Sequence, residues 1–180
     1  MNTMKATNLQ VVVASPDDVR GMQEVFYRTW LATYPNKEHG ITEDDIEDRY
    51  KDRLSEEKLA QRREQIAHPP EGQTTLVART DDLVVGVCRV MKHSDRNQLY
   101  TIYVLPEYHG QGIGSAMWTE AQKYLDSTKP TIVQVATYNT NAIKFYERLG
   151  FVDTGKRFSD QKFIMKSGAV IPEMEMIRQA

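Results

Sequence analysis

Three β-rich runs joined by short turn signals most constrain the fold of this chain. They span residues 74–79, 83–91 and 98–104. Asp81-Asp82 follows the first run and Asp95-Arg96-Asn97 follows the second, and clusters of this kind are typical of turns. Because consecutive strands joined by short turns usually pair with each other, the three runs predict an antiparallel meander.

Helices are expected before this meander, after a first short strand at residues 10–14. Ser15-Pro16-Asp17-Asp18 supplies a capping serine, a first-turn proline and two acids, which together predict a helix start. Apolar residues at helical spacing continue from there to Thr33. A second cap at Thr42 opens a charged helical segment, which restarts at Ser55.

Helices and strands alternate after the meander. Helical spacing covers residues 113–124 and 142–149, and an extended pattern lies between them at residues 131–136. Two further strands are expected around residues 162–165 and 173–177. This order predicts an α/β fold whose mostly antiparallel sheet turns parallel at the strand between the two helices.

Length and composition exclude several classes of protein. The 180 residues predict one domain over residues 1–180, and 40% hydrophobic with 27% charged residues is ordinary globular usage. The net charge of -2 predicts no nucleic-acid partner. No apolar run approaches the ~20 residues of a membrane span, and none forms a signal-peptide core, so we expect a cytoplasmic protein without a membrane partner. Cys88 is the only cysteine, which excludes an internal disulfide, and its apolar neighbours predict a buried thiol.

The segment between residues 104 and 116 has the pattern of a strand, a glycine-rich turn and the start of a helix. Glycines allow the backbone to approach a ligand, and the free amides of a helix start bind phosphate. A P-loop does not fit, because Ser115-Ala116 follows Gly114 and no suitable lysine precedes it. A dinucleotide fingerprint would need a glycine at Ser115 or Met117. A diphosphate remains the expected ligand, and a turn that only joins the two elements is the alternative.

Two motifs resemble the GNAT superfamily of N-acetyltransferases. The first is Leu99-x-x-Ile102-Tyr103-Val104-x-Pro106-Glu107-Tyr108-His109-Gly110-Gln111-Gly112-Ile113-Gly114, and the second is Asn139-x-x-Ala142-Ile143-Lys144-Phe145-Tyr146-Glu147-Arg148-Leu149-Gly150-Phe151. His109 departs from the family, which usually has Arg or Gln at the head of this loop. The resemblance covers the whole domain in its order of elements. It implies a GNAT-like mixed, mostly antiparallel sheet flanked by helices, with a splayed central strand pair.

The resemblance implies that acetyl-CoA is the acetyl-donor cosubstrate. The glycine loop would hold its pyrophosphate, the preceding strand would pair with the pantetheine arm, and the Val104 amide would polarise the thioester carbonyl. The cofactor-binding residues so implied are Ile102, Tyr103, Val104, His109, Gly110, Gln111, Gly112, Ile113, Gly114, Ser115, Asn139 and Phe145. The residues alone allow a second interpretation of two of these positions. Asn139 also fits a helix N-cap, and Phe145 also fits a core residue.

Tyr146 is the implied catalytic residue, although periodicity alone would place it in the core. By the resemblance it is the acid that protonates the departing thiolate, whose free pKa is about 8.5. Some family members carry a Glu on the strand that corresponds to residues 98–104, but this segment has no carboxylate. We therefore expect a base that acts through water, or an amine that arrives neutral.

The acceptor side is expected near Trp30 and Tyr34, a pair that resembles a feature of polyamine and small-amine acetyltransferases; for Trp30 a core position is the alternative. The acidic segment from Glu43 to Asp48 would suit a cationic amine, and a solvated helix face is its alternative. The predicted function is acetyl transfer to a primary amine of a polyamine, another small amine or a protein, without a metal. A non-catalytic acyl-CoA-binding or sensory module is the alternative, and a homodimer is left open.

Overall fold

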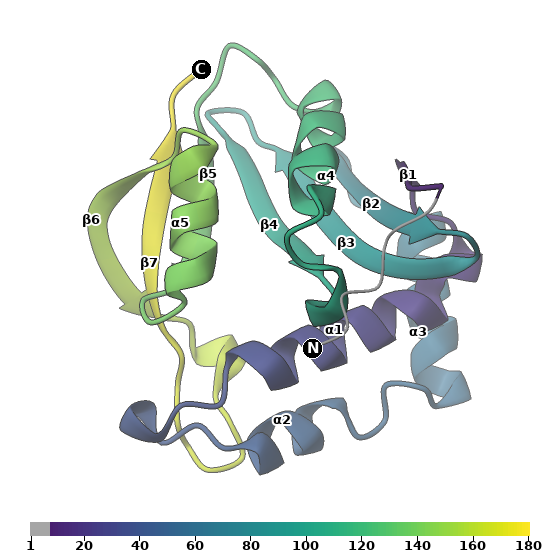
Figure 1. The fold of residues 1–180 in the computed structure, drawn as a ribbon, viewed down its shortest axis with the longest axis vertical. Helices are drawn as coiled ribbons and strands as arrows, with labels where there is room; N and C mark the ends of the chain where they lie inside the picture. The colour runs from purple at the N-terminus through teal and green to yellow at the C-terminus, as the bar shows by residue number, and fades with distance from the viewer. Residues whose placement is uncertain (1–7) are drawn as a thin grey trace.

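A seven-stranded sheet with helices on both faces forms the framework of the computed structural model, which describes residues 8–180 (Figure 1). The strand order is β1-β2-β3-β4-β5-β7-β6. The strands are β1 Gln10–Val13, β2 Gln73–Thr80, β3 Leu83–Lys92, β4 Asn97–Val104, β5 Thr131–Ala136, β6 Val152–Ser159 and β7 Pro172–Arg178. The helices are α1 Val19–Thr33, α2 Glu43–Tyr50, α3 Glu56–Ala67, α4 Ile113–Ala121 and α5 Thr140–Arg148.

The sheet consists of two antiparallel parts that meet at one short parallel pairing. Strands β1 to β4 form the predicted meander, and β5, β7 and β6 form the second antiparallel part. Between them, β4 pairs with β5 in parallel only over residues 97–99 and 131–133. Beyond these residues the two strands diverge, and the gap is visible in Figure 1. The expected mostly antiparallel GNAT-like sheet with a splayed central pair is therefore confirmed.

A β-bulge accounts for the place where β4 leaves β5. Along β3, Arg89 pairs with Thr101 and the next residue, Val90, pairs with Leu99, so Tyr100 is an extra residue on β4. Bulges bend a strand and increase its local twist. Because this one follows Leu99, the last residue of β4 paired with β5, it turns the rest of β4 away from β5.

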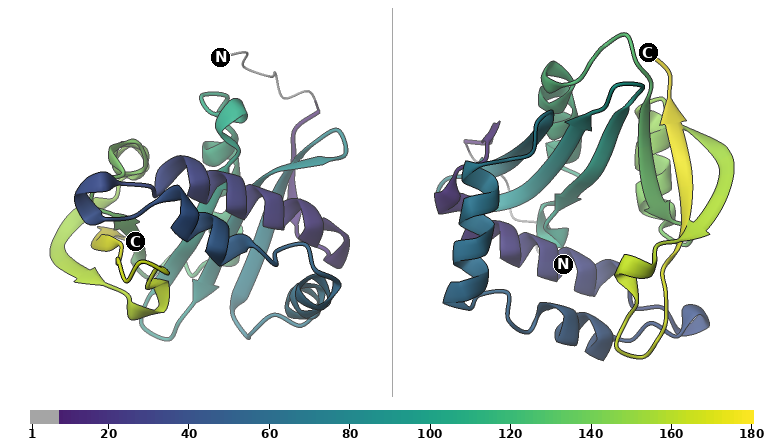
Figure 2. Two further views of the ribbon diagram at one scale, coloured as in Figure 1. Left: turned by 90° about the horizontal axis from the view of Figure 1, so that it is seen from below. Right: turned by 180° about the vertical axis from the view of Figure 1, so that it is seen from behind.

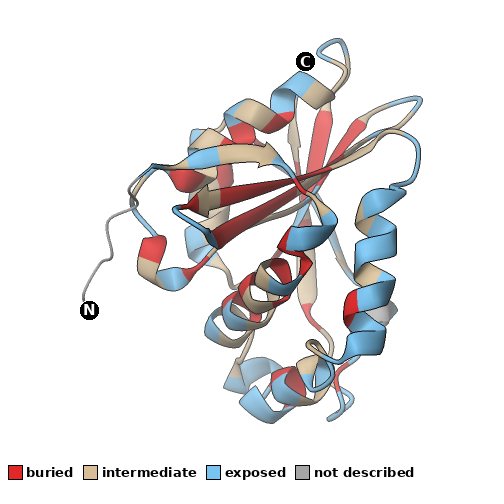
Figure 3. Ribbon diagram, turned by 90° about the vertical axis from the view of Figure 1, so that its right-hand side faces the viewer, coloured by how far each residue is buried: buried red, intermediate tan, exposed pale blue. Residues whose placement is uncertain are grey.

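Helices cover the two faces of the sheet differently. Figure 2 shows α1 and α2 running side by side, while α4 and α5 lie in front of the sheet in Figure 1. The strands between them carry about half of the buried residues, which are drawn red in Figure 3. The expected buried thiol is confirmed, since Cys88 lies inside β3 and burial raises its pKa to about 12. Among the described residues, no helix is long and apolar enough to cross a membrane.

One predicted strand is wrong. Residues 162–165 lie in a 3-10 turn, Gln161–Phe163, and the loop after it, while the strand that pairs with β7 is β6. Strand β6 is largely exposed and mostly polar, so its sequence lacks the alternation that marks a half-buried strand. Phe163 and Met165 have an apolar pattern because they pack in a core cluster around Trp30.

The start of α1 is fixed to β2 by a buried carboxylate. Asp18 accepts hydrogen bonds from the Ser15 amide at 2.7 Å, from Arg79 Nε at 2.8 Å and from Arg79 Nη2 at 2.6 Å. Burial by itself would raise the pKa of Asp18, but the hydrogen bonds from Arg79 and Ser15 outweigh it and lower that pKa. The pair therefore stabilises the fold above the unfolded pKa of 3.8, and this stabilisation is lost as pH falls through the lower, folded value.

We expect Asp18→Asn to lower the free energy of unfolding at pH 7 by about 2 kcal/mol, since it leaves a half-buried guanidinium without its counter-charge. Urea denaturation measures this loss. Asp153→Asn is the matched control, because Asp153 also binds both Nη atoms of one arginine, Arg157, but on the exposed surface. A loss for Asp18→Asn no greater than that of the control would contradict the assignment.

Candidate active site

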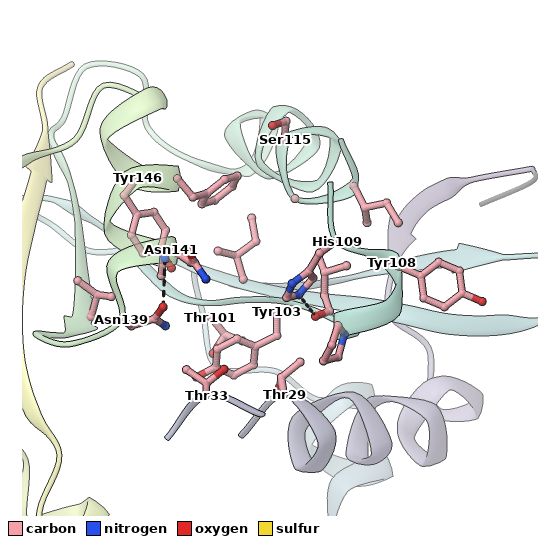
Figure 4. Close-up of a pocket in the computed structure, with 18 of the residues that line it drawn as sticks. Thr29, Thr33, Thr101, Tyr103, Tyr108, His109, Ser115, Asn139, Asn141 and Tyr146 are labelled. Carbon is pink, nitrogen blue, oxygen red and sulfur yellow. Dashed lines mark hydrogen bonds between the residues drawn. The ribbon is translucent and has the colours of Figure 1, made fainter. Parts of the chain in front are cut away.

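Two cavities meet at the gap between β4 and β5. The glycine-loop cavity has a volume of about 460 Å³ and is lined by β4, the loop after it, the first turn of α4 and α5 (Figure 4). The aromatic cavity has a volume of about 710 Å³ and is lined by α1, α2, α3 and the strands that face them. The residues common to both linings are Tyr34, Tyr100, Thr101, Tyr103 and Gln134. Both volumes suit small molecules, and the shared residues make the gap a passage between them.

The glycine loop offers backbone amides to an open space. Gly110 and Gly112 have φ angles of 77° and 78°, a left-handed conformation that favours glycine, and a Cβ on either would meet nothing within 4 Å. A Cβ on Gly114 would lie 3.2 Å from the ring of Phe145, so this glycine lets α4 start close to α5. The first amides of a helix have no intrahelical partner and carry its positive dipole end. This end of the cavity can therefore hold a phosphate.

The structure places the implied cofactor residues around this one cavity, with the exception of Gln111, which lies outside the lining. His109 does not aim its ring at the loop: its Nε2–H donates to the Val104 carbonyl at 2.7 Å and braces the end of β4. Asn139 accepts a hydrogen bond from the Ala142 amide at 3.1 Å, which confirms its N-cap role for α5. Both contacts are drawn among the side chains of Figure 4.

The Val104 amide faces the gap. The next amide, Leu105 N–H, donates to the Val85 carbonyl on β3 at 2.9 Å. Because backbone groups of successive strand residues point to opposite edges, the N–H of Val104 points away from β3, toward the gap beside β5. A carbonyl oxygen placed in the gap can accept this hydrogen bond.

Tyr146 lies on α5 and lines the glycine-loop cavity, with only 6% of its surface exposed. Its ring packs against Phe145 and Phe151 at centroid distances of 5.5 and 5.8 Å. Burial, then the nearby Tyr103 and Cys88, raise the pKa of its hydroxyl above the ordinary value of 10. The hydroxyl therefore stays protonated at neutral pH and can donate a hydrogen bond into the cavity.

The aromatic cavity contains the predicted acceptor residues. Trp30 and Tyr34 lie in contact on α1, with ring centroids 4.4 Å apart, and the two hydroxyls of Tyr34 and Tyr103 are 3.1 Å apart. Trp30 is 6% exposed and belongs to a core cluster, which confirms the core position given as its alternative, and it also lines the cavity. Tyr34 lines both cavities and lies at the passage.

A carboxylate that sequence reasoning missed, Glu173, also lines the aromatic cavity. It pairs with Ala136 across β5, and its Oε2 atom is buried without a hydrogen-bond partner. Burial, then the charge of Asp160, raise the pKa of Glu173 to about 7. Alternation along β7 puts Glu173 and Glu175 on the face opposite the buried Met174. Within the part of the chain that the structure describes, Glu175 pairs with Lys156 at 2.9 Å, and Glu173 forms no ion pair. This alternation of charged and apolar residues is the sequence signal that could have pointed to Glu173.

The acidic segment of α2 lies outside both cavity linings. Asp45 accepts hydrogen bonds from the Thr42 and Ser167 amides, both at 2.8 Å, and its pKa falls to about 2 because these bonds outweigh its desolvation. Asp44 pairs with Lys166 at 3.2 Å. These acids cap α2 and tie it to the loop before β7, contrary to the expectation that they receive a cationic acceptor.

Comparison with known proteins identifies one family. Residues 37–166 match the model described as an acetyltransferase (GNAT) domain. An uncharacterised N-acetyltransferase of Methanocaldococcus jannaschii is 39% identical over 56 residues, which is 30% of this chain and 25% of that relative. The match thus spans a quarter of the curated relative.

Two solved structures share the fold over nearly the whole chain. The PaiA N-acetyltransferase of Thermoplasma acidophilum, in complex with coenzyme A, is 20% identical with a TM-score of 0.73, covering 97% of this chain and 100% of that one. YncA of Salmonella typhimurium, with its cofactor acetyl-CoA, is 19% identical with a TM-score of 0.61, covering 96% and 94%. At these identities the likeness shows the fold alone.

We expect Gly112→Glu to abolish measurable coenzyme A binding, because its carboxylate would enter the space open to a phosphate and repel it. Calorimetry with coenzyme A measures the loss. Gly155→Glu is the matched control: Gly155 has a φ of 83° and an equally open Cβ direction, but lies on β6. The control carries the same backbone strain and keeps its affinity. Unchanged affinity in folded Gly112→Glu would place the diphosphate elsewhere.

Proposed function

Since this chain belongs to the GNAT acetyltransferase family, we propose that it transfers the acetyl group of acetyl-CoA to a primary amine held in the aromatic cavity. The observation that carries this proposal is the meeting of two cavities at one gap in the sheet. Acetyl-CoA occupies the glycine-loop cavity, with its diphosphate on the α4 amides. Its thioester reaches the gap, where an amine from the opposite face of the sheet meets it.

The donor side of the reaction uses the end of β4. The Val104 amide donates to the thioester carbonyl oxygen, which gains negative charge when the amine attacks the carbonyl carbon. The new C–N bond forms, the C–S bond breaks, and the electron pair of that bond leaves on sulfur. Tyr146 holds a proton at its hydroxyl and donates it toward this sulfur. Its raised pKa keeps the donor loaded across neutral pH.

The acceptor side must remove a proton from the amine, and we assign this role to Glu173. The groups that interact electrostatically with Glu173 are the carboxylate of Asp160, just after β6, and the phenols of Tyr34, Tyr103 and Tyr138. The hydrogen bond between Tyr34 and Tyr103 lies at the passage, so the proton reaches Glu173 through these hydroxyls or through water. A base with a pKa near the working pH suits this task.

Release of free coenzyme A with a panel of amines tests the function itself. The panel contains polyamines, amino acids, amino sugars and peptides with a free N-terminus. Thiol release above the slow hydrolysis rate, together with the acetylated amine in the mass spectrum, supports acetyl transfer. Acetyl-CoA that binds but stays unchanged with every amine would favour a non-catalytic acyl-CoA-binding module instead.

We expect Tyr146→Phe to lower kcat by roughly 10²-fold, because it removes the proton donor while keeping the ring in its aromatic contacts. Steady-state kinetics and calorimetry separate this from binding, and the Kd of acetyl-CoA should stay within about twofold. Tyr27→Phe is the control, since Tyr27 lies outside both cavities and binds Glu47. A normal kcat in Tyr146→Phe, or a lower Tm as its only defect, would make Tyr146 a packing residue.

We expect kcat/KM to increase as pH rises through about 7, where Glu173 loses its proton, and Glu173→Gln to remove this limb of the profile. Because the pKa of Glu173 in the folded protein lies above its ordinary value of 4.5, wild-type stability declines as pH rises between these two values, and Glu173→Gln removes that decline too. Glu175→Gln is the matched control on the same strand face. A Glu173→Gln variant with an unaltered pH profile would exclude this base.

A further inference from the structure

Three arginines line the aromatic cavity, and two of them have a buried guanidinium nitrogen and no acidic partner among the described residues. Arg89 lies inside β3, opposite Thr101 of β4, and Arg62 lies on α3. The Nε atoms of both guanidinium groups are buried and have no hydrogen-bond partner. Among the described residues, Arg62 donates to a neutral side chain, Gln65 Oε1 at 2.7 Å, and neither arginine forms an ion pair.

This arrangement is unfavourable without a ligand. Burial lowers the pKa of Arg89, and the neighbouring charge of Arg62 lowers it further. Two other partly buried arginines have carboxylates, Asp18 for Arg79 and Glu24, at 3.2 Å, for Arg53, and the partly buried Nε of Arg178 donates to the Leu149 carbonyl. Because an uncompensated charge inside a protein is strongly unfavourable, two that face one cavity indicate an anion that binds there.

The charged groups of the lining come from different elements. The carboxylates belong to Asp160, just after β6, and Glu173 of β7, while Arg62 and Arg89 come from α3 and β3. The third arginine, Arg49 of α2, lies over the rings of Trp30 and Phe163. Thr101, which pairs with Arg89, belongs to both cavity linings, so Arg89 lies in the part of the aromatic cavity beside the passage. A molecule held by Arg62 and Arg89 can therefore still reach the gap.

We propose that the acceptor is an amine that also carries an anionic group, a carboxylate or a phosphate, and that Arg62 and Arg89 bind this group. That the amine is acetylated rests on the proposed function, whereas binding of the anionic group does not. The guanidinium groups take the anion through charge-assisted hydrogen bonds, and the amine is left toward the gap and Glu173. A polyamine would instead bring cationic groups against two guanidinium groups, which disfavours it.

Binding to the coenzyme A-loaded protein tests the anion site without any turnover. Calorimetry compares probe pairs that differ in the anionic group: leucine with leucinamide, glutamate with its diamide, and phosphoethanolamine with ethanolamine. We expect at least one anionic member to bind tenfold or more tightly than its neutral partner, and the carboxylate and phosphate pairs distinguish the two sources of charge. Equal affinity within every pair, or no affinity for any probe, would overturn the proposal.

Variants locate the site. Arg89→Gln and Arg62→Gln should each weaken the preferred anionic probe about tenfold or more and leave its neutral partner and acetyl-CoA unchanged. Arg63→Gln, one residue along α3 on an exposed side chain, is the matched control and should have no effect. Because Arg89→Gln removes an unpaired, desolvated charge, its Tm without ligand should equal or exceed that of the wild type. An anion preference that persists in both variants would overturn the assignment.

Turnover separates this proposal from the function on which it rests. If the anionic probes are acetylated, their KM should rise in Arg89→Gln while kcat stays close to the wild-type value. Binding of an anionic amine without any release of coenzyme A would contradict the proposed acetyl transfer and leave the anion site supported. Efficient acetylation of neutral amines, with the anionic partners neither bound nor acetylated, would support the transferase and overturn the anion site.

Discussion

The early end of the pairing between β4 and β5 is the constraint on which the rest of this structure depends. The two strands share hydrogen bonds only as far as Leu99 and Val133, and the bulge at Tyr100 then turns β4 away. Backbone groups on the open edge of β4, including the Val104 amide, are left without a strand partner. An unpaired buried amide costs about 1–3 kcal/mol, so this edge favours a ligand that supplies hydrogen bonds.

The gap also connects two cavities of different character on the two faces of the sheet. On one face, the glycine turn and the start of α4 offer amides, α5 offers the Tyr146 phenol, and the lining contains a single arginine side chain, Arg148. On the other face, the helices α1, α2 and α3 contribute aromatic rings and arginines, and the β6–β7 part of the sheet contributes the carboxylates Asp160 and Glu173. A phosphate-bearing donor and a charged acceptor therefore reach the same point without competing for one surface.

Much of the fold was predictable from local patterns. The meander, β5 and α5 follow strong alternation or helical periodicity, and their caps, Thr42 and Asn139 among them, are made by the side chains that the sequence indicates. Strand β6 was missed because an exposed strand has no reason to alternate, whereas residues 162–165 are apolar for packing in a loop. The pattern of apolar residues indicates which residues are buried, but buried residues do not always lie in helices or strands.

Some residues of the candidate site were predictable from the sequence and others were not. Residues within the two contiguous motifs come together in one cavity, because a turn and a helix start keep near neighbours close. Glu173, Arg62 and Arg89 were not predicted as site residues, since they lie outside both motifs in three different elements, which only the fold brings to one cavity. Arg89 carried a signal nonetheless: it is the one charged residue between Leu83 and Met91, an apolar stretch of the central sheet, where a buried charge requires a partner or a ligand.

A crystal structure of the complex with coenzyme A would show whether acetyl transfer takes place at the gap, because the position of the sulfur atom decides it. We expect the diphosphate on the amides that follow Gly110 and the sulfur in the gap between β4 and β5, within hydrogen-bond distance of the Tyr146 hydroxyl. Pantetheine that lies along the outside of α5, with its sulfur remote from the gap and from Tyr146, would contradict acetyl transfer at this place.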